Sequence, residues 1–228
     1  MLITSLLILT NQLLAVDAKG GFAPPSTITK SLKVGQYLGA ISCASSNCHG
    51  SVKPRDVYDI HQNEYFTWLQ KDQHAQAYNV LFNERSAHIA RNISLTKKPN
   101  ESPDSLACHA SNPPTQVAQT GETDIRREGI SCEGCHGPAG GWIVNHIEKN
   151  VHDRSVMAGM TDLRNLEKRA KTCLACHLGN AQKTVDHELI SAGHPRLTFE
   201  LDNYSEAMPP HWTPLTSKRE QRGIQKTA

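Results

Sequence analysis

The sequence is poor in bulky apolar side chains for a chain of 228 residues. It contains only 4 Phe, 3 Trp and 5 Tyr, and hydrophobic residues of all kinds make up 38% of it. The side chains therefore supply less apolar filling than a domain of this length normally uses. We expect something other than side chains to fill part of the interior.

Long hydrophobic runs and blocks of like charge are also missing. The strongly apolar run, residues 2–16, is short and broken by Thr, Asn and Gln, whereas a membrane-spanning helix needs about 20 apolar residues. The 24 Lys and Arg nearly balance the 22 Asp and Glu, with no long basic arm of the kind that binds nucleic acid. These absences predict a mature chain with no membrane span and no nucleic-acid partner.

The apolar N-terminal run is typical of a secretory signal peptide. Val16 and Ala18 are small or apolar at the two positions that a signal peptidase inspects, so we expect cleavage after Ala18. The run departs from the usual pattern because no Lys or Arg precedes Lys19, and a buried N-terminal helix is the alternative. The predicted division is a signal peptide over residues 1–18 and one domain over 19–228, in a periplasmic or otherwise exported protein.

Against these shortages stand 7 Cys and 12 His, an excess of metal-binding side chains. The cysteines fall in four segments, each of which ends in Cys-His. They are Cys43-Ala-Ser-Ser-Asn-Cys48-His49, Ser105-Leu-Ala-Cys108-His109, Cys132-Glu-Gly-Cys135-His136 and Cys173-Leu-Ala-Cys176-His177. The pattern indicates bound metal or haem.

The third and fourth segments are complete C-x-x-C-H sequences, the signature of covalent haem attachment. On a helix, positions i, i+3 and i+4 share one face. The two thiols can then add to the two haem vinyl groups while the imidazole reaches the iron. A Cys₄ zinc site is the alternative, but it would leave His136 and His177 without a role.

The first two segments depart from this signature. With four residues between Cys43 and Cys48, a regular helix cannot place both thiols and His49 on one face, so the intervening loop must bulge; a plain disulfide is the alternative. In the second segment Ser105 replaces the first thiol. Cys108 would then form a single thioether with His109 as axial ligand, unless the site has decayed and Cys108 is a buried thiol. We therefore expect four haems, the one at Cys108 held by one bond or absent.

The chain shows no strong strand pattern, and helical periodicity is plain in two places. One runs from about residue 61 to 92, with a restart at Asp72 as an N-cap, and the other from 162 to 177. Pro and Gly mark loops at 20–25, 98–103, 112–114, 137–141 and 208–214. The fold class predicted is mainly α with extensive loops.

Eight histidines remain outside the four segments and are candidates for the second axial ligand of an iron. They are His61, His74, His88, His146, His152, His187, His194 and His211. The mature chain keeps only three Met, at positions 157, 160 and 208, so His is the better supplied ligand type. Spacing alone does not choose among the eight.

These segments together resemble the tetrahaem cytochromes c of the cytochrome c-554 type, known from ammonia oxidisers as electron acceptors for hydroxylamine oxidoreductase. The likeness spans about residues 37–194. It includes the attachment sites in order, Lys71-Asp72-Gln73-His74-Ala75-Gln76-Ala77, Gly129-Ile130-Ser131 before Cys132, and His146 shortly after the third site. The segment Ala192-Gly193-His194-Pro195 is similar to that of relatives from environmental bacteria.

The resemblance implies a compact multihaem cytochrome c fold organised around stacked, covalently bound haems. It implies His146 as distal ligand of the His49 haem and His74 as that of the His136 haem. For the His177 haem it supplies a downstream His, for which we take His194, with His187 and His211 as alternatives. The second haem of the family is five-coordinate and corresponds to His109, at the site where this sequence departs from the pattern.

Two functions are consistent with these patterns. The first is a periplasmic electron carrier that exchanges electrons with redox partner proteins through three or four haems, because no other catalytic motif is present. The alternative is an enzyme that reduces nitric oxide or hydroxylamine at an open haem ligated by His109.

Overall fold

The computed structural model describes residues 32–55, 60–111, 124–148 and 152–207. The chain divides into two units, residues 1–32 and 33–228, and the helices and cysteine segments belong to the second unit. The predicted signal peptide, the predicted loops at 20–25, 112–114 and 208–214, and His211 lie outside the described residues. Over the described residues the regular structure is helical, and the pairing of Asn180 with Lys183 is an isolated bridge. The prediction of a mainly α chain is confirmed.

The helices are short and alternate with single 3₁₀ turns. The α-helices are α2 (Glu64–Lys71), α3 (Glu84–Asn92), α4 (Pro103–His109), α5 (Cys132–His136), α6 (His152–Met157), α7 (Leu166–His177), α8 (His187–Ser191) and α9 (Leu201–Ala207). The 3₁₀ turns are η1 (Ala40–Cys43), η2 (Gln73–Gln76), η3 (Asn79–Phe82), η4 (Pro99–Glu101), η5 (Ile125–Glu128), η6 (Ala139–Gly141) and η7 (Asn145–Ile147).

Polar caps explain where the predicted helices break. The long helix expected over 61–92 is divided into α2, η2, η3 and α3. Asp72 caps η2 by accepting the His74 backbone N–H, as predicted, and Asn83 caps α3 through Ser86 N–H. The second predicted helix begins at Leu166 rather than at 162, because Asn165 accepts the Lys168 N–H and fixes the first turn.

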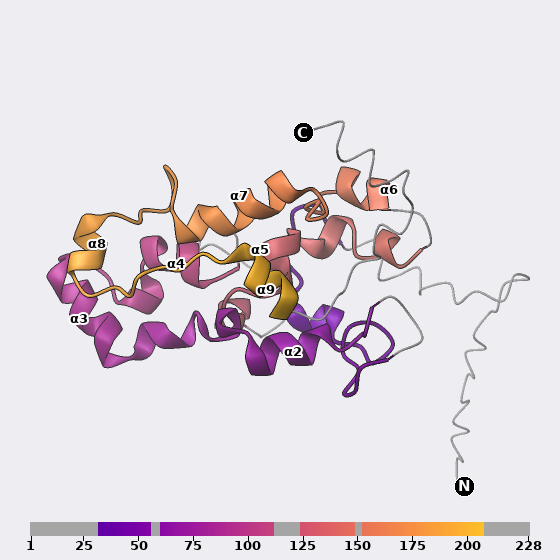
Figure 1. Ribbon diagram of the computed structural model, residues 1–228, viewed down its shortest axis with the longest axis horizontal. Helices are drawn as coiled ribbons and strands as arrows, with labels where there is room; N and C mark the ends of the chain where they lie inside the picture. Colours follow the sequence, from indigo (N-terminus) through magenta and orange to yellow (C-terminus); the bar gives the residue numbers. More distant parts are fainter. Residues whose placement is uncertain (1–31, 56–59, 112–123, 149–151, 208–228) are drawn as a thin grey trace, which may run out of the picture. The chain divides into compact units, whose positions relative to one another are not determined.

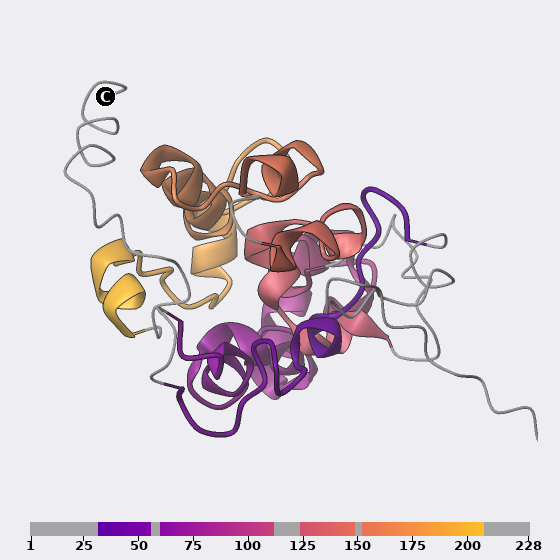
Figure 2. The same cartoon turned by 90° about the vertical axis from the view of Figure 1, so that its right-hand side faces the viewer.

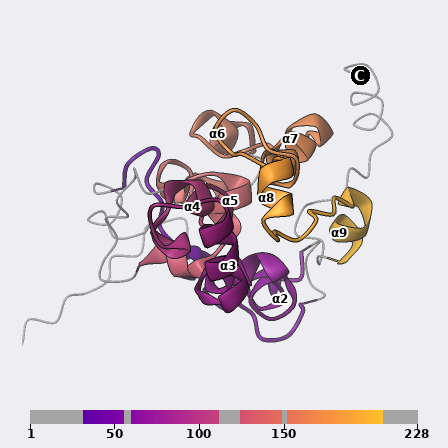
Figure 3. The same ribbon diagram turned by 90° about the vertical axis from the view of Figure 1, so that its left-hand side faces the viewer.

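Segments far apart in the sequence lie side by side. The helix α7 runs on one side, α2 and α3 lie on the other, and α4, α5 and α8 lie between them, as Figures 1 and 3 show from two directions. Figure 2 gives the same order, with α7 in orange above the purple α2–α3 segment. Two hydrogen bonds join segments that are far apart in the sequence. Asn92 on α3 donates to Ala192 O just after α8 (2.9 Å), and Tyr204 on α9 donates to Asp72, the cap of η2 (2.7 Å).

The apolar core consists of small clusters. One contains Tyr78, Leu81, Leu106 and Ala110, and another contains Ala40, Trp68 and Ala75 with Tyr65 and Cys132 packed against it. No residue of α7 is buried, although that helix carries two of the seven thiols. The limited core agrees with the shortage of bulky apolar side chains in the sequence.

A buried carboxylate links α5 to the segment that precedes the first cysteine. Glu133 is 2% exposed, and its two oxygens accept three backbone N–H groups, from Leu38 (3.0 Å to each oxygen), Gly39 (2.8 Å) and Ala139 (2.7 Å). Hydrogen bonds to a charged acceptor are stronger than those to a neutral one. Glu133 therefore holds residues 38–39, which precede the first cysteine segment, against α5.

Gly129 allows the segment before α5 to approach His74. Its φ of 66° is strained for any residue with a Cβ, and a Cβ at this position would lie 2.5 Å from the His74 carbonyl oxygen. The same oxygen accepts the Ile130 N–H at 3.0 Å, and Ile130 O accepts the Trp68 indole N–H at 2.9 Å. The backbone of residues 129–131 is thereby packed against η2.

Candidate haem-binding site

Three of the four cysteine segments lie at the C-terminal ends of helices. The helices α4, α5 and α7 each end at the histidine of their segment, His109, His136 and His177 respectively. In α5 and α7 the two cysteines and the histidine occupy positions i, i+3 and i+4, which share one helical face. In α4, Ser105 takes the place of the first thiol on the same face as Cys108 and His109. The arrangement expected from the spacing is present.

The first segment forms a closed loop instead of a helix. After η1, the chain turns so that His49 N–H donates to Cys43 O at 3.1 Å, and Cys48 N–H donates to Ser45 O at 2.8 Å. The bulge predicted for residues 44–47 is therefore observed. It brings His49 back beside Cys43 without a continuous helical turn.

The thiols of different segments meet. All seven cysteines lie in the described residues, and none forms a disulfide. Cys43 lies within hydrogen-bonding reach of Cys132, which lowers the pKa of Cys43 to about 7. Cys108 lies within the same reach of Cys176, and this contact, together with the Lys183 ammonium at 3.0 Å, lowers the pKa of Cys176 to about 5. The first segment therefore adjoins the third, and the second adjoins the fourth.

Histidine rings lie opposite each other in at least three places. The ring centres of His49 and His146 are 6.4 Å apart with planes 17° from parallel. Those of His74 and His177 are 6.0 Å apart at 68°. Those of His109 and His194 are 6.3 Å apart at 80°. Each pair joins a histidine of a cysteine segment to one of the candidates outside the segments.

The six paired rings share one hydrogen-bonding pattern. In each, Nδ1 is engaged by an oxygen, and the partners are Glu64 for His49 (3.1 Å), Asp72 for His74 (2.8 Å), Ala77 O for His109 (2.6 Å), Ile143 O for His146 (2.6 Å), Thr198 O for His177 (2.7 Å) and Pro195 O for His194 (2.9 Å). An oxygen partner on one ring nitrogen fixes the tautomer and the ring orientation of a metal-binding histidine. The nitrogen that remains for a metal is Nε2 in all six.

These pairs have the dimensions of a metal bound between two imidazoles. Two metal–nitrogen bonds of about 2 Å in line, with roughly 1 Å from each nitrogen to its ring centre, span about 6 Å. The ring-centre distances of 6.0–6.4 Å match this length. Beside the first pair, the buried indole N–H of Trp142 has no hydrogen-bond partner, and its ring packs edge-on to His146 at 5.3 Å. The residues present therefore fit a haem iron bound by two histidines. The Trp142 indole N–H is a donor suited to a carboxylate of such a haem.

Two pairings differ from those that the resemblance implies. The resemblance places His74 opposite His136 and His194 opposite His177; in the structure His74 lies opposite His177 and His194 lies opposite His109. The cause of the second is the turn after α8, which the Asn92 side chain holds against α3 through Ala192 O. The His49–His146 pairing is the one expected.

Two of the paired histidines have a carboxylate as the partner of Nδ1, and their pKa values shift in the opposite direction from those of two others. The hydrogen bond to Glu64 raises the pKa of His49, and that to Asp72 raises the pKa of His74. Burial lowers the pKa of His109 and of His146. A carboxylate partner increases the basicity of a ligand nitrogen more than a carbonyl does.

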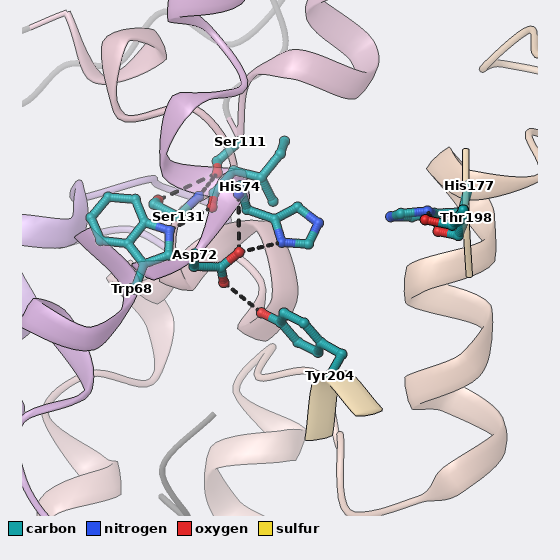
Figure 4. A network of polar contacts seen from close by, with 9 residues as sticks. Trp68, Asp72, His74, Ser111, Ser131, His177, Thr198 and Tyr204 are labelled. Carbon is teal, nitrogen blue, oxygen red and sulfur yellow. Dashed lines mark hydrogen bonds and ion pairs between the residues drawn. The ribbon is translucent and has the colours of Figure 1, made fainter. Parts of the chain in front are cut away.

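Asp72 is part of a small network, drawn in Figure 4. Its Oδ1 accepts both the backbone N–H (3.0 Å) and the ring Nδ1–H (2.8 Å) of His74, and its Oδ2 accepts the Tyr204 hydroxyl at 2.7 Å. Burial opposes the ionisation of Asp72, but these hydrogen bonds outweigh it and lower its pKa. Burial and the Asp72 charge raise the pKa of Tyr204, so its hydroxyl stays protonated and donates.

The sequence analysis does not identify Glu64 or Tyr204. It also does not identify Asp72 as the hydrogen-bond partner of the His74 ring. The sequence pattern predicts Asp72 only as a helix cap, although an acid two residues before a ligand histidine is a usable signal. Glu64 and Tyr204 lie 15 and 132 residues from their partners, His49 and Asp72, so no local pattern connects them. The carbonyl partners of the other rings have no sequence signature at all.

The zinc alternative finds no site among these residues. In the described part of the chain, no three His, Cys, Asp or Glu side chains are grouped so that they could hold a metal ion between them. A zinc site would need four such ligands around one ion.

No helix in the described residues is long and apolar enough to cross a bilayer.

Helix-borne thiols followed by histidines, with histidine rings facing each other at the spacing of a doubly ligated iron, define the class of c-type cytochromes. Residues 57–137 match the family described as Cytochrome c554 and c-prime, and this segment belongs to that family. It includes the second and third cysteine segments and His74. Membership implies covalently bound haem c and electron transfer. No curated protein and no solved structure matches the chain.

Proposed function

We propose that this protein is an exported tetrahaem cytochrome c that carries electrons between redox partner proteins. The thioether residues in this proposal are Cys43, Cys48, Cys108, Cys132, Cys135, Cys173 and Cys176. The proximal ligands are His49, His109, His136 and His177. The distal ligands are His146 opposite His49, His194 opposite His109, and His74 opposite His177.

The observation that carries the proposal is the set of three facing histidine pairs with every Nδ1 engaged. A bound haem supplies an iron that gains and loses one electron. The chain's own residues orient both imidazoles in advance through Glu64, Asp72 and backbone carbonyls, so little rearrangement accompanies each electron transfer. The contacts between thiols of different segments support close spacing of the haems.

The enzyme alternative requires an iron at His109 with an open position for nitric oxide or hydroxylamine. The His194 ring stands opposite His109 at a ring-centre distance of 6.3 Å, and its Nδ1–H donates to Pro195 O, leaving Nε2 for the iron. This arrangement favours a closed, doubly ligated site. The second haem would then differ from the five-coordinate haem that the resemblance implies.

The test is the spin state of the purified holoprotein. We expect the reduced wild type to bind no carbon monoxide at the His109 site, and His194→Ala to gain one high-spin haem that binds it. His187→Ala is the matched control, because His187 is an exposed histidine on α8, seven positions earlier in the chain. An unchanged spectrum in His194→Ala, or carbon monoxide binding in the wild type at a site abolished with Cys108→Ala, would overturn the closed-site assignment.

A further inference from the structure

We propose that Asp72, with its charge moderated by Tyr204, sets a low reduction potential at the iron bound by His74 and His177. The inference rests on the proposed function, since it takes His74 as an axial ligand. It adds two residues that act through that ligand and touch no reacting atom, so both are positioning residues.

Asp72 places a nearly buried negative charge against the His74 ring. The ring Nδ1–H donates to an Asp72 oxygen at 2.8 Å, and the Asp72 side chain is 6% exposed, so water screens the carboxylate poorly. A buried negative charge on Nδ1–H shifts electron density towards Nε2 and makes this nitrogen a stronger donor. A stronger donor favours the oxidised metal, which carries one more positive charge, over the reduced metal.

Tyr204 opposes this effect of Asp72. Its hydroxyl donates to the other Asp72 oxygen at 2.7 Å, and its ring packs edge-on to His74 at 5.5 Å. A hydrogen bond to a carboxylate disperses part of its charge and makes it a weaker acceptor for a second donor. Tyr204 therefore limits how far Asp72 can polarise His74.

The His109–His194 pair differs from the His74–His177 pair in the charge of its hydrogen-bond partners. On the opposite side of the same pair, His177 donates to a backbone carbonyl, that of Thr198, at 2.7 Å (Figure 4). His109 and His194 both donate to carbonyls, those of Ala77 and Pro195. A carbonyl carries no full charge. The iron of the His74–His177 pair is therefore expected to have a lower potential than that of the His109–His194 pair.

The experiment is a spectroelectrochemical titration of the holoprotein and three variants. Asp72→Asn keeps an oxygen that can cap η2, since Asn and Asp are similar caps, but removes the charge. We expect the midpoint potential of one haem to rise by about 59 mV, a tenfold change in the one-electron equilibrium. Tyr204→Phe should lower the potential of the same haem. Asp202→Asn, an exposed residue on α9 with the same change in net charge, should leave it unchanged.

The two variants are expected to shift the midpoint potential in opposite directions. This distinguishes tuning from structural support, because a loosened His74 ring would shift the potential in the same direction in both. Shifts of the same sign, or no shift in either, would overturn the proposal. His74→Ala separates this failure from a failure of the proposed function. If His74 is a ligand, that variant converts one low-spin haem to high-spin. If its spectrum is unchanged, the ligand assignment is wrong, and the tuning proposal falls with it.

Discussion

Removing the Glu133 carboxylate should destabilise the fold strongly without affecting haem attachment. The residue stands between the two cysteines of the third segment, at a position that the C-x-x-C-H signature leaves open. Its oxygens accept the N–H groups of Leu38, Gly39 and Ala139 at 2.7–3.0 Å, and the side chain is almost fully buried. In Glu133→Ala these three donors, two of them buried and that of Leu38 half-buried, lose their acceptor.

The magnitude depends on the number of donors. A hydrogen bond to a charged group contributes about 1.5–3 kcal/mol, so three of them at the low end give about 4–5 kcal/mol. With an m-value of about 4 kcal/mol/M in guanidinium chloride, the unfolding midpoint should fall by about 1 M. Glu133→Gln retains one acceptor oxygen, so its unfolding midpoint should fall by about half as much.

The assay is guanidinium unfolding of the holoproteins, followed by far-ultraviolet circular dichroism, with intact mass confirming equal haem content. Covalent attachment keeps the haems on both the folded and unfolded chains, so the midpoints compare the same chemical species. Glu206→Ala, an exposed residue on α9, controls for loss of one negative charge. A midpoint shift in Glu133→Ala no larger than that of the control would refute this account of how α5 is held to residues 38–39.

Four further predictions concern other positions. Intact mass of the wild type should show four covalent haem increments, and Cys108→Ala should show three; three increments in both would mean that the second site is not loaded. Glu64→Gln should raise the potential of one haem, as measured by redox titration, because it removes the carboxylate that accepts the His49 ring N–H. Gly129→Ala should lose more than about 1 kcal/mol in denaturant unfolding, because φ is 66° and the added Cβ meets the His74 carbonyl. Asn165→Ala should lose about 1 kcal/mol in the same assay through loss of the α7 cap.

The sequence is sufficient to predict the local features. The cysteine spacings predict helical attachment segments in α5 and α7 and a bulged first segment, because i, i+3 and i+4 geometry depends on neighbouring residues alone. The shortage of bulky apolar side chains predicts that side chains fill only part of the interior, and the buried apolar residues form small clusters. The prediction of Asp72 as a cap is confirmed.

The long-range features are not predictable in this way. Which histidine faces which depends on how α8 packs on α3 and how α9 packs beside η2, and the hydrogen bonds Asn92–Ala192 and Tyr204–Asp72 that fix these contacts have no periodic signature. Resemblance supplies the His49–His146 pair but not the partners of His109 and His177. The acceptors of the ring Nδ1–H groups are mostly backbone carbonyls, which every residue possesses.

The facing histidines also bear on how the protein is assembled. In each pair one ring belongs to a segment made much earlier than the other, so a chain that emerges from its N-terminus presents His49, His74 and His109 before any of their partners. The partners emerge in the order 146, 177 and 194. In the proposed holoprotein, a haem attached while the chain emerges has one protein ligand at His49 until His146 is made and at His109 until His194 is made, whereas the haem at His177 finds His74 already made. The site with a single thioether position, at Cys108, is the last of the three to receive its second histidine.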